Sequence, residues 1–326
     1  MFAIAVQILA IFAMIGIGMI AARQRWFSDD FSTQLSTLLL RVFYPSLLFS
    51  AILRNYTLVK IVENWLFPVG AAGIILLGWF VGRIAKQYVH GRAPTRRAFH
   101  FACTMNNYSF LPIMIVAGTA LGEHGVAMVA LTTIGSDTLM WTLGFRTFTG
   151  QKLHWNTLPQ LILRPPIFAL CSALVTLVIL HFIRLNGEDL MNCLPTRVAL
   201  DTLYRYLGGA TIPTSAIICG MRLMSIRVSG LFSPLQLLTV ALRMLLIPAI
   251  ILTLIILLPL TPDQQIVFAI IALMPGAMVG VSMAEVHGGD IPFISAMILN
   301  THIVCIITVP IGLWILSQFQ GSSGLL

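Results

Sequence analysis

The chain has 326 residues, 58% of them hydrophobic and only 9% charged, and its mean hydropathy is +0.94. A soluble domain carries about a quarter charged residues, so this composition excludes a soluble protein and indicates a membrane protein with several spans. The formal net charge of +8 does not indicate a nucleic-acid partner, because the basic residues lie in connections beside apolar stretches, as membrane topology favours.

Apolar segments of about twenty residues, the length needed to cross a bilayer, follow one another along the whole chain. The first precedes its basic residues, Arg23 and Arg25, so we expect a retained span and not a cleaved signal peptide. The connections are too short for a separate soluble domain. Ten spans are predicted, at 3–22, 32–53, 64–86, 98–119, 124–146, 160–183, 198–221, 234–258, 265–285 and 291–316.

The basic residues are distributed unevenly over the connections. Eleven lie in the odd-numbered connections and four in the even-numbered ones. Because basic connections stay in the cytoplasm, we expect both termini to lie outside a plasma membrane. The eleven are Arg23, Arg25, Arg83, Lys86, Arg92, Arg96, Arg97, Arg146, Lys152, Arg222 and Arg227, and the four are Arg54, Lys60, Arg184 and Arg197.

The fourth predicted span is interrupted by polar residues, Asn106, Asn107, Tyr108 and Ser109, and Pro112 follows them. An unpaired amide or backbone group costs several kcal/mol in hydrocarbon. Proline also removes a donor and crowds the carbonyl four residues back. We therefore predict that this helix breaks beside a protein-lined cavity.

The ninth predicted span has a similar interruption, at Pro275, Gly276 and Gly280. Asn107 and Pro275 are 168 residues apart, and so are Pro45 in the second span and Pro213 in the seventh. One offset thus relates two halves, 1–153 and 154–320, with five spans each. Since five is odd, the halves must have inverted topology, and paired breaks indicate a transporter binding site.

Five motifs follow one another along the chain: RVFYPSLLFSAIL, MNNYSFLP, ALGEHGVAM, LGGATIPTSAIICGMRL and MPGAMVGVSMAEVHGGD. In this order and spacing they resemble the auxin efflux carrier family of membrane transport proteins, and in particular its bacterial malonate-type carriers. The resemblance implies an all-α membrane protein with helices 4 and 9 crossing at the membrane centre, alternating access between a scaffold and a transport domain, a bacterial inner membrane, and a homodimer.

The residues at the two breaks are the candidate substrate site. A carboxamide can pair free backbone groups or bind a substrate carboxylate, and the half-helix after each break favours an anion at its N-terminus. The alternative is that both asparagines only satisfy the broken backbone. Pro112, Pro275, Gly276 and Gly280 are expected to shape the breaks. The candidate set is Asn106, Asn107, Tyr108, Ser109, Pro275, Gly276, Ala277 and Met278.

Four other polar residues inside predicted spans are candidates for ion coupling: Ser136, Asp137, Asn300 and His302. A buried carboxylate can be protonated reversibly in a carrier. A fixed ion pair of Asp137 with an arginine is the equally weighted alternative. Histidine could titrate near neutral pH or simply hydrogen-bond to a neighbour. Among arginines inside spans, we expect Arg41 and Arg243 to extend their side chains to the headgroups.

Enzyme function is not expected, because the sequence has no nucleotide-binding loop, metal-ligand cluster or redox pair, and no complete intramembrane protease motif. The five cysteines form no disulfide framework. No cofactor and no metal are therefore expected. The prediction is a secondary carrier for a small organic anion, coupled to protons or the membrane potential, with a ligand-sensing receptor of the same fold, or a channel, as alternatives.

Overall fold

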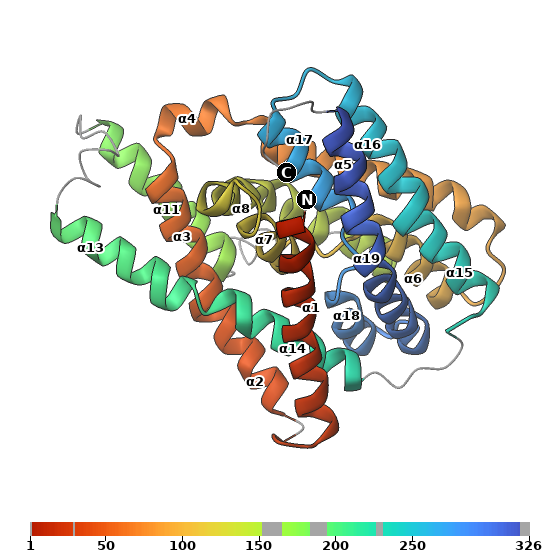
Figure 1. The fold of residues 1–326 in the computed structure, drawn as a ribbon. Helices are drawn as coiled ribbons and strands as arrows, with labels where there is room; N and C mark the ends of the chain where they lie inside the picture. Colours follow the sequence, from red (N-terminus) through yellow and green to blue (C-terminus); the bar gives the residue numbers. More distant parts are fainter. Residues whose placement is uncertain (1, 29, 152–164, 183–193, 226–230, 320–326) are drawn as a thin grey trace.

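The computed structural model describes residues 2–28, 30–151, 165–182, 194–225 and 231–319, and this part of the chain is helical, with one isolated backbone bridge and no strand (Figure 1). The helices of the first half are α1 (Phe2–Arg23), α2 (Phe31–Leu38), η1 (Leu39–Phe43), α3 (Tyr44–Asn55), α4 (Leu58–Glu63), α5 (Leu66–Ala85), η2 (Lys86–Tyr88), α6 (Ala93–Thr104), α7 (Phe110–Ala117), α8 (Gly122–Leu139), η3 (Met140–Gly144) and α9 (Phe145–Thr149).

The remaining helices are α11 (Pro165–Phe182), α13 (Leu194–Thr202), η5 (Leu203–Gly208), α14 (Thr211–Ser225), α15 (Pro234–Ala241), η6 (Leu242–Leu246), α16 (Ile247–Leu257), α17 (Pro262–Ala272), α18 (Val279–His287) and α19 (Ile291–Phe319). The predicted boundary between the two halves, and Cys193, lie outside the described residues. The four described cysteines are free thiols.

Several of these helices are long and apolar enough to cross a membrane, so the chain is a multi-pass membrane protein. Six qualify among the described residues: Phe31–Asn55, Leu58–Tyr88, Gly122–Thr149, Pro165–Phe182, Pro234–Leu257 and Ile291–Phe319. Leu9–Arg23 within α1 is apolar but shorter. The predicted fourth and ninth spans are each divided into two short helices, α6 with α7 and α17 with α18.

Local sequence explains where α17 begins and ends. Thr261 and Gln264 form a reciprocal capping box, and Pro262 occupies the first turn, where its missing N–H costs nothing. The helix ends at Ala272, with Leu273 as its C-cap, because Pro275 disfavours helical geometry at Met274, the residue before it. The chain therefore leaves the helix where the sequence predicts a break.

Two turns of π-helix in the described part of the chain, η1 and η6, lie next to prolines. Pro45 follows η1 and Pro248 follows η6. A proline cannot donate to the carbonyl four residues back, here that of Arg41 or Met244. The wider turn accommodates this loss without ending the helix. The segment Phe31–Asn55 thus remains one continuous helical run of 25 residues.

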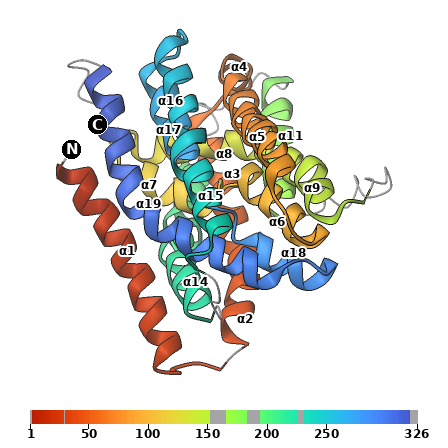
Figure 2. The same ribbon diagram turned by 90° about the vertical axis from the view of Figure 1, so that its right-hand side faces the viewer.

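The helices form two groups. In one, α1 packs along α14 and α11 packs against α3, while α3 also contacts η5. In the other, α5, α6, α8, α17 and α19 pack together around rings such as Phe67 and Phe268, whose centroids are 5.7 Å apart. Figure 1 places α3, α11 and α13 on the left, α14 near the middle beside α1, and α6, α15 and α16 on the right, and Figure 2 shows α1 at one edge with α19 beside it.

Glycines allow the closest of these contacts. A Cβ atom on Gly220 of α14 would overlap the backbone carbonyl oxygen of Ile15 in α1, and one on Gly18 would overlap that of Ile217. Between α5 and α8, a Cβ on Gly135 would overlap the carbonyl oxygen of Pro68. Small residues let helix backbones approach in this way where lipid offers no hydrophobic driving force.

Candidate functional site

The two helix breaks lie against each other. Asn106 and Gly276 form an antiparallel backbone bridge. Beside it, the Asn107 N–H donates to the Pro275 carbonyl oxygen at 2.8 Å, and the Ala277 N–H donates to the Met105 carbonyl oxygen at 3.3 Å. Backbone groups that the broken helices leave without partners therefore pair with one another across the two halves, which removes most of the cost of a break inside a membrane.

The Asn106 side chain also joins the two breaks. Its Nδ2 donates to the Ile271 carbonyl oxygen in the last turn of α17, and the residue is 1% exposed. Its Oδ1 is buried without a hydrogen-bond partner among the described residues. The Asn106 side chain therefore satisfies a backbone carbonyl, as the alternative interpretation predicts, and its Oδ1 remains available as an acceptor.

The tenth predicted span supports the break through Thr301. Its hydroxyl accepts from the Gly276 N–H at 3.1 Å and donates to the Met297 carbonyl oxygen at 2.9 Å. Its neighbours point elsewhere: Asn300 Nδ2 donates to the Leu231 carbonyl oxygen, and His302 Nδ1 bonds to the Ile298 carbonyl oxygen. Of this polar patch, only Thr301 contacts the crossing.

Arg243 in η6 is fully buried, at 0% exposure, so the prediction that it reaches the headgroups is wrong. Its Nε and Nη2 donate to the Met274 carbonyl oxygen at 3.3 and 3.2 Å, and Nη2 also reaches the Ala272 carbonyl oxygen at 3.3 Å. The guanidinium thus satisfies the last carbonyls of α17, where a cation also interacts favourably with the helix dipole. Arg41, by contrast, is exposed.

A cavity of about 390 Å³ lies beside the crossing. Of the predicted substrate residues, it is lined by Asn106, Asn107, Tyr108, Ser109, Ala277 and Met278. Pro275 and Gly276 belong to the crossing and not to the lining, and Pro112 and Gly280 are buried in the half-helices. The other lining residues are Ser36, Leu39, Leu40, Tyr44, Phe110, Asp137, Met140, Trp141, Pro165, Pro166, Ile167, Ser215, Ile218, Cys219, Arg222, Val279 and Ser282.

Asp137 of α8 is the carboxylate among the described residues of the cavity wall. The Tyr108 hydroxyl, from the first break, donates to its Oδ1 at 2.6 Å. The preceding residue, Ser136, is fully buried and does not line the cavity. The structure therefore brings Asp137 to the break residues and leaves Ser136, Asn300 and His302 away from the cavity.

Arg222 is the cation among the described residues of the cavity wall, and it was not predicted there, because the sequence places it in the seventh connection. In the structure α14 continues to Ser225, and Arg222 Nη2 donates to the Ser36 hydroxyl at 3.1 Å. Its position within the motif AIICGMRL, 168 residues after Arg54, is the signal that could have identified it.

The wall combines few polar groups with a largely apolar surface. Among the described wall residues, amides at 106 and 107, hydroxyls at 36, 109, 215 and 282, and the guanidinium of Arg222 can bind an anionic group, while Phe110, Trp141 and Ile218 can cover an apolar body. Helices α7 and α18 begin at the cavity, so their N-terminal dipoles add positive potential. Among the described residues there is no group of His, Cys, Asp and Glu that could hold a metal ion.

Comparison with known proteins identifies the family of the chain. A family model described as "Membrane transport protein" matches residues 3–313, nearly the whole chain, whereas a comparison with curated proteins finds no match. Since this family consists of transporters, its match also points to a protein that is not an enzyme. The chain belongs to the auxin efflux carrier family of membrane transport proteins.

Proposed function

We propose that the protein is a secondary carrier that moves a small organic anion across the membrane by alternating access, with the substrate bound in the cavity beside the crossing. The observation that carries this proposal is the composition of the cavity wall. Arg222, Asn107 and two helix N-termini converge on one apolar-lined space, and a charged cavity residue inside a membrane usually serves transport.

The helix packing supports an inverted repeat of five plus five helices. The first helix of each half packs on the second helix run of the other half: α1 on α14, and α11 on α3. The broken helices meet at positions that differ by nearly the same offset as Pro45 and Pro213. A carrier with this symmetry can exchange the roles of its two halves, opening the cavity first to one side and then to the other.

The helix groups supply a scaffold and a transport domain for this motion. We assign α1, α2–α3, α11 and α13–α14 to the scaffold, and α5–α9 and α15–α19 to the transport domain. The cavity is lined by both groups, with Arg222 and Ser36 on one and Asn107 and Asp137 on the other. A substrate held between two bodies is released when they move relative to each other.

The orientation in the membrane and the energy source are part of the same proposal. We propose N- and C-termini outside a bacterial inner membrane, from the excess of basic residues in odd-numbered connections. Coupling to protons or the membrane potential is favoured over sodium, since a hard cation needs several convergent oxygens and the described residues of the wall include one carboxylate, Asp137. The homodimer and the malonate-type substrate remain predictions from the family resemblance.

Flux into proteoliposomes tests the function. Small carboxylates that stabilise the purified protein in a thermal-shift screen are used as labelled substrates. A carrier gives saturable uptake that is accelerated by the same compound on the other side, and Asn107→Ala raises the substrate concentration needed for half-maximal uptake about tenfold. A receptor binds without flux, and a channel gives flux without counter-exchange, so either result contradicts the proposal.

Labelling from outside the cell tests the orientation. Cysteine at exposed Val59, after α3, should react with an impermeant maleimide, and cysteine at exposed Arg92, before α6, should react only after the membrane is opened. Val59 is in the first turn of α4 and Arg92 directly precedes α6, and both side chains are exposed, so neither change should affect folding. The reverse pattern would contradict the proposed topology and leave the proposed carrier function intact.

A further inference from the structure

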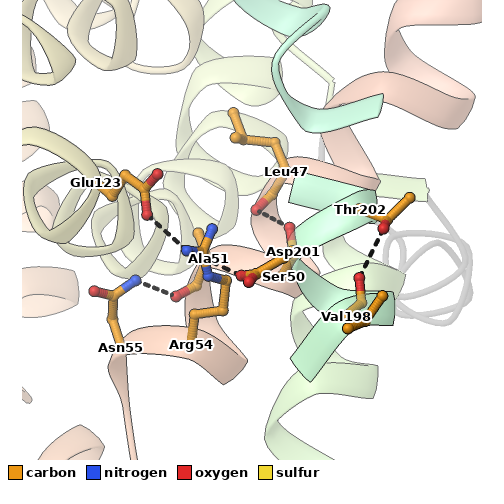
Figure 3. A network of polar contacts seen from close by, with 9 residues as sticks. All are labelled: Leu47, Ser50, Ala51, Arg54, Asn55, Glu123, Val198, Asp201 and Thr202. Carbon is orange, nitrogen blue, oxygen red and sulfur yellow. Dashed lines mark hydrogen bonds and ion pairs between the residues drawn. The ribbon is translucent and has the colours of Figure 1, made fainter. Parts of the chain in front are cut away.

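A polar network joins three helices at the end of α3, away from the cavity (Figure 3). Arg54 Nη2 lies 3.1 Å from Glu123 Oε2 at the start of α8, and 3.1 Å from Asp201 Oδ1 in α13. The Arg54 guanidinium also lies 4.5 Å from the ring centroid of Tyr204. One arginine of the proposed scaffold thus holds the first turn of a transport-domain helix.

The cavity arginine occupies the corresponding place in the second half. Adding the repeat offset of 168 to Arg54 gives Arg222, and adding it to Ser36 gives Tyr204. The repeat therefore relates two contacts between the halves: Arg54 contacts Tyr204, and Arg222 contacts Ser36. Neither contact was used to find the offset, so they support the repeat independently.

These two contacts lie at opposite ends of the bundle. Ser36 and Arg54 belong to one continuous helical run, Phe31–Asn55. At 1.5 Å per residue they are separated by about 27 Å along its axis, close to the thickness of the hydrocarbon core. The network at Arg54 is therefore near one membrane face and Arg222 near the other.

The two arginines differ in their acidic partners. Arg54 has two ion pairs, whereas Arg222 has none with a described residue and lines the cavity instead. Its guanidinium nevertheless interacts electrostatically with Glu285 of α18, an exposed residue close to the start of α19. Helix α19 occupies the place in the second half that α8, with Glu123, occupies in the first.

We propose that Arg54 and Arg222 act as alternate latches between scaffold and transport domain. The Arg54–Glu123 pair closes its own face in the state described here, and an Arg222–Glu285 pair closes the other face after the transport domain has moved. The proposal rests on the alternating access inferred above. The pair suits this role because Arg54 and Glu123 have 19% and 52% of their side-chain surface exposed, so the latch is weak enough to open in every cycle.

Labelling of Cys219, which lines the cavity beside Arg222, tests the latches. In a variant that retains Cys219 as its single cysteine, the rate of reaction with a charged thiol reagent in detergent reports the population with this cavity accessible. Glu123→Gln should lower that rate up to about fivefold, the range open to a partly exposed ion pair. Adding Glu285→Gln, which removes the other latch, should restore the rate.

Asp201→Asn is the matched control, because it removes a bond of the same length to the same arginine. That bond stays within the scaffold, so the labelling rate should not change. The proposal is overturned if Glu123→Gln has no effect, if Asp201→Asn lowers the rate equally, or if Glu285→Gln does not restore it. Labelling requires no substrate, so the two proposals can fail separately. If this labelling pattern is seen but flux is absent, only the carrier function is refuted. If flux is normal but the labelling pattern is not seen, only the latches are refuted.

Discussion

Arg243 and Met274 form the contact that holds the second break in place: two guanidinium nitrogens donate to one carbonyl oxygen, at 3.3 and 3.2 Å. The residue is completely buried, and its nearest acceptors are backbone atoms of the crossing. A charge in such a place is costly to bury and costly to remove, because its partners would remain unpaired.

Replacing Arg243 should therefore destabilise the fold. Arg243→Ala leaves the carbonyls of Ala272 and Met274 without this donor, at about 1–3 kcal/mol each, partly offset by removing a desolvated charge. We expect a net loss of about 2–4 kcal/mol, measured as a lower thermal midpoint in detergent. Arg41→Ala, at an exposed arginine in another π-helical turn, should change stability by less than about 0.5 kcal/mol. Equal midpoints for the two variants would contradict a structural role for Arg243.

The neighbouring asparagines should behave differently from each other. Asn106→Ala removes the donor to the Ile271 carbonyl and should lower the thermal midpoint, by about 1–3 kcal/mol of stability. Asn107 contributes its backbone N–H to the crossing and its side chain to the cavity, so Asn107→Ala should fold normally and bind a carboxylate about tenfold more weakly. Calorimetric binding and thermal unfolding on both variants check this, and a stable Asn106→Ala protein would contradict it.

Arg222 should control anion affinity. A charged hydrogen bond contributes about 1.5–3 kcal/mol, so Arg222→Gln should weaken carboxylate binding by about 10- to 150-fold. Arg205→Gln, at an exposed arginine in η5, is the control and should bind normally. Unchanged affinity in Arg222→Gln would show that the substrate is held by the amides and helix ends alone.

The breaks could be predicted from the sequence because proline and adjacent asparagines cannot lie unpaired in hydrocarbon. The roles of the arginines could not be predicted from the sequence. Distance along a span does not tell whether a guanidinium reaches the headgroups, as Arg41 can, or turns inward to carbonyls 31 residues away, as Arg243 does. Likewise Thr301, and not Asn300 or His302, reaches Gly276, because a helical rotation of one residue decides which side chain faces the crossing.

Asp137 should carry the pH dependence of transport. Asp137→Asn cannot exchange a proton, so uptake should lose its pH dependence, while affinity for the carboxylate stays within about tenfold, or 1.4 kcal/mol. Tyr108→Phe removes the hydroxyl that donates to Asp137 and keeps the carboxyl group, so it should retain a pH dependence. Strong stimulation by sodium with an unchanged pH profile in Asp137→Asn would contradict proton coupling.

The contact between α1 and α14 should depend on Gly220. A Cβ atom there meets the Ile15 carbonyl oxygen, which is backbone and cannot easily move, so Gly220→Ala should cost about 1–3 kcal/mol. Gly16→Ala, on the same pair of helices, meets nothing within 4 Å and should be tolerated. Thermal unfolding of the two variants tests this prediction. Equal midpoints would show that α1 and α14 can move apart without loss of stability.

The bridge between Asn106 and Gly276 also has a consequence for biosynthesis. When residues 105–109 enter the membrane, the chain that supplies their backbone partners has not yet been made. Until the ninth segment is synthesised, the fourth must either stay near water or be covered by the insertion machinery, because its unpaired amides are costly in lipid. The first five segments expressed alone should therefore insert poorly and be degraded, and co-expression of the second half should rescue them.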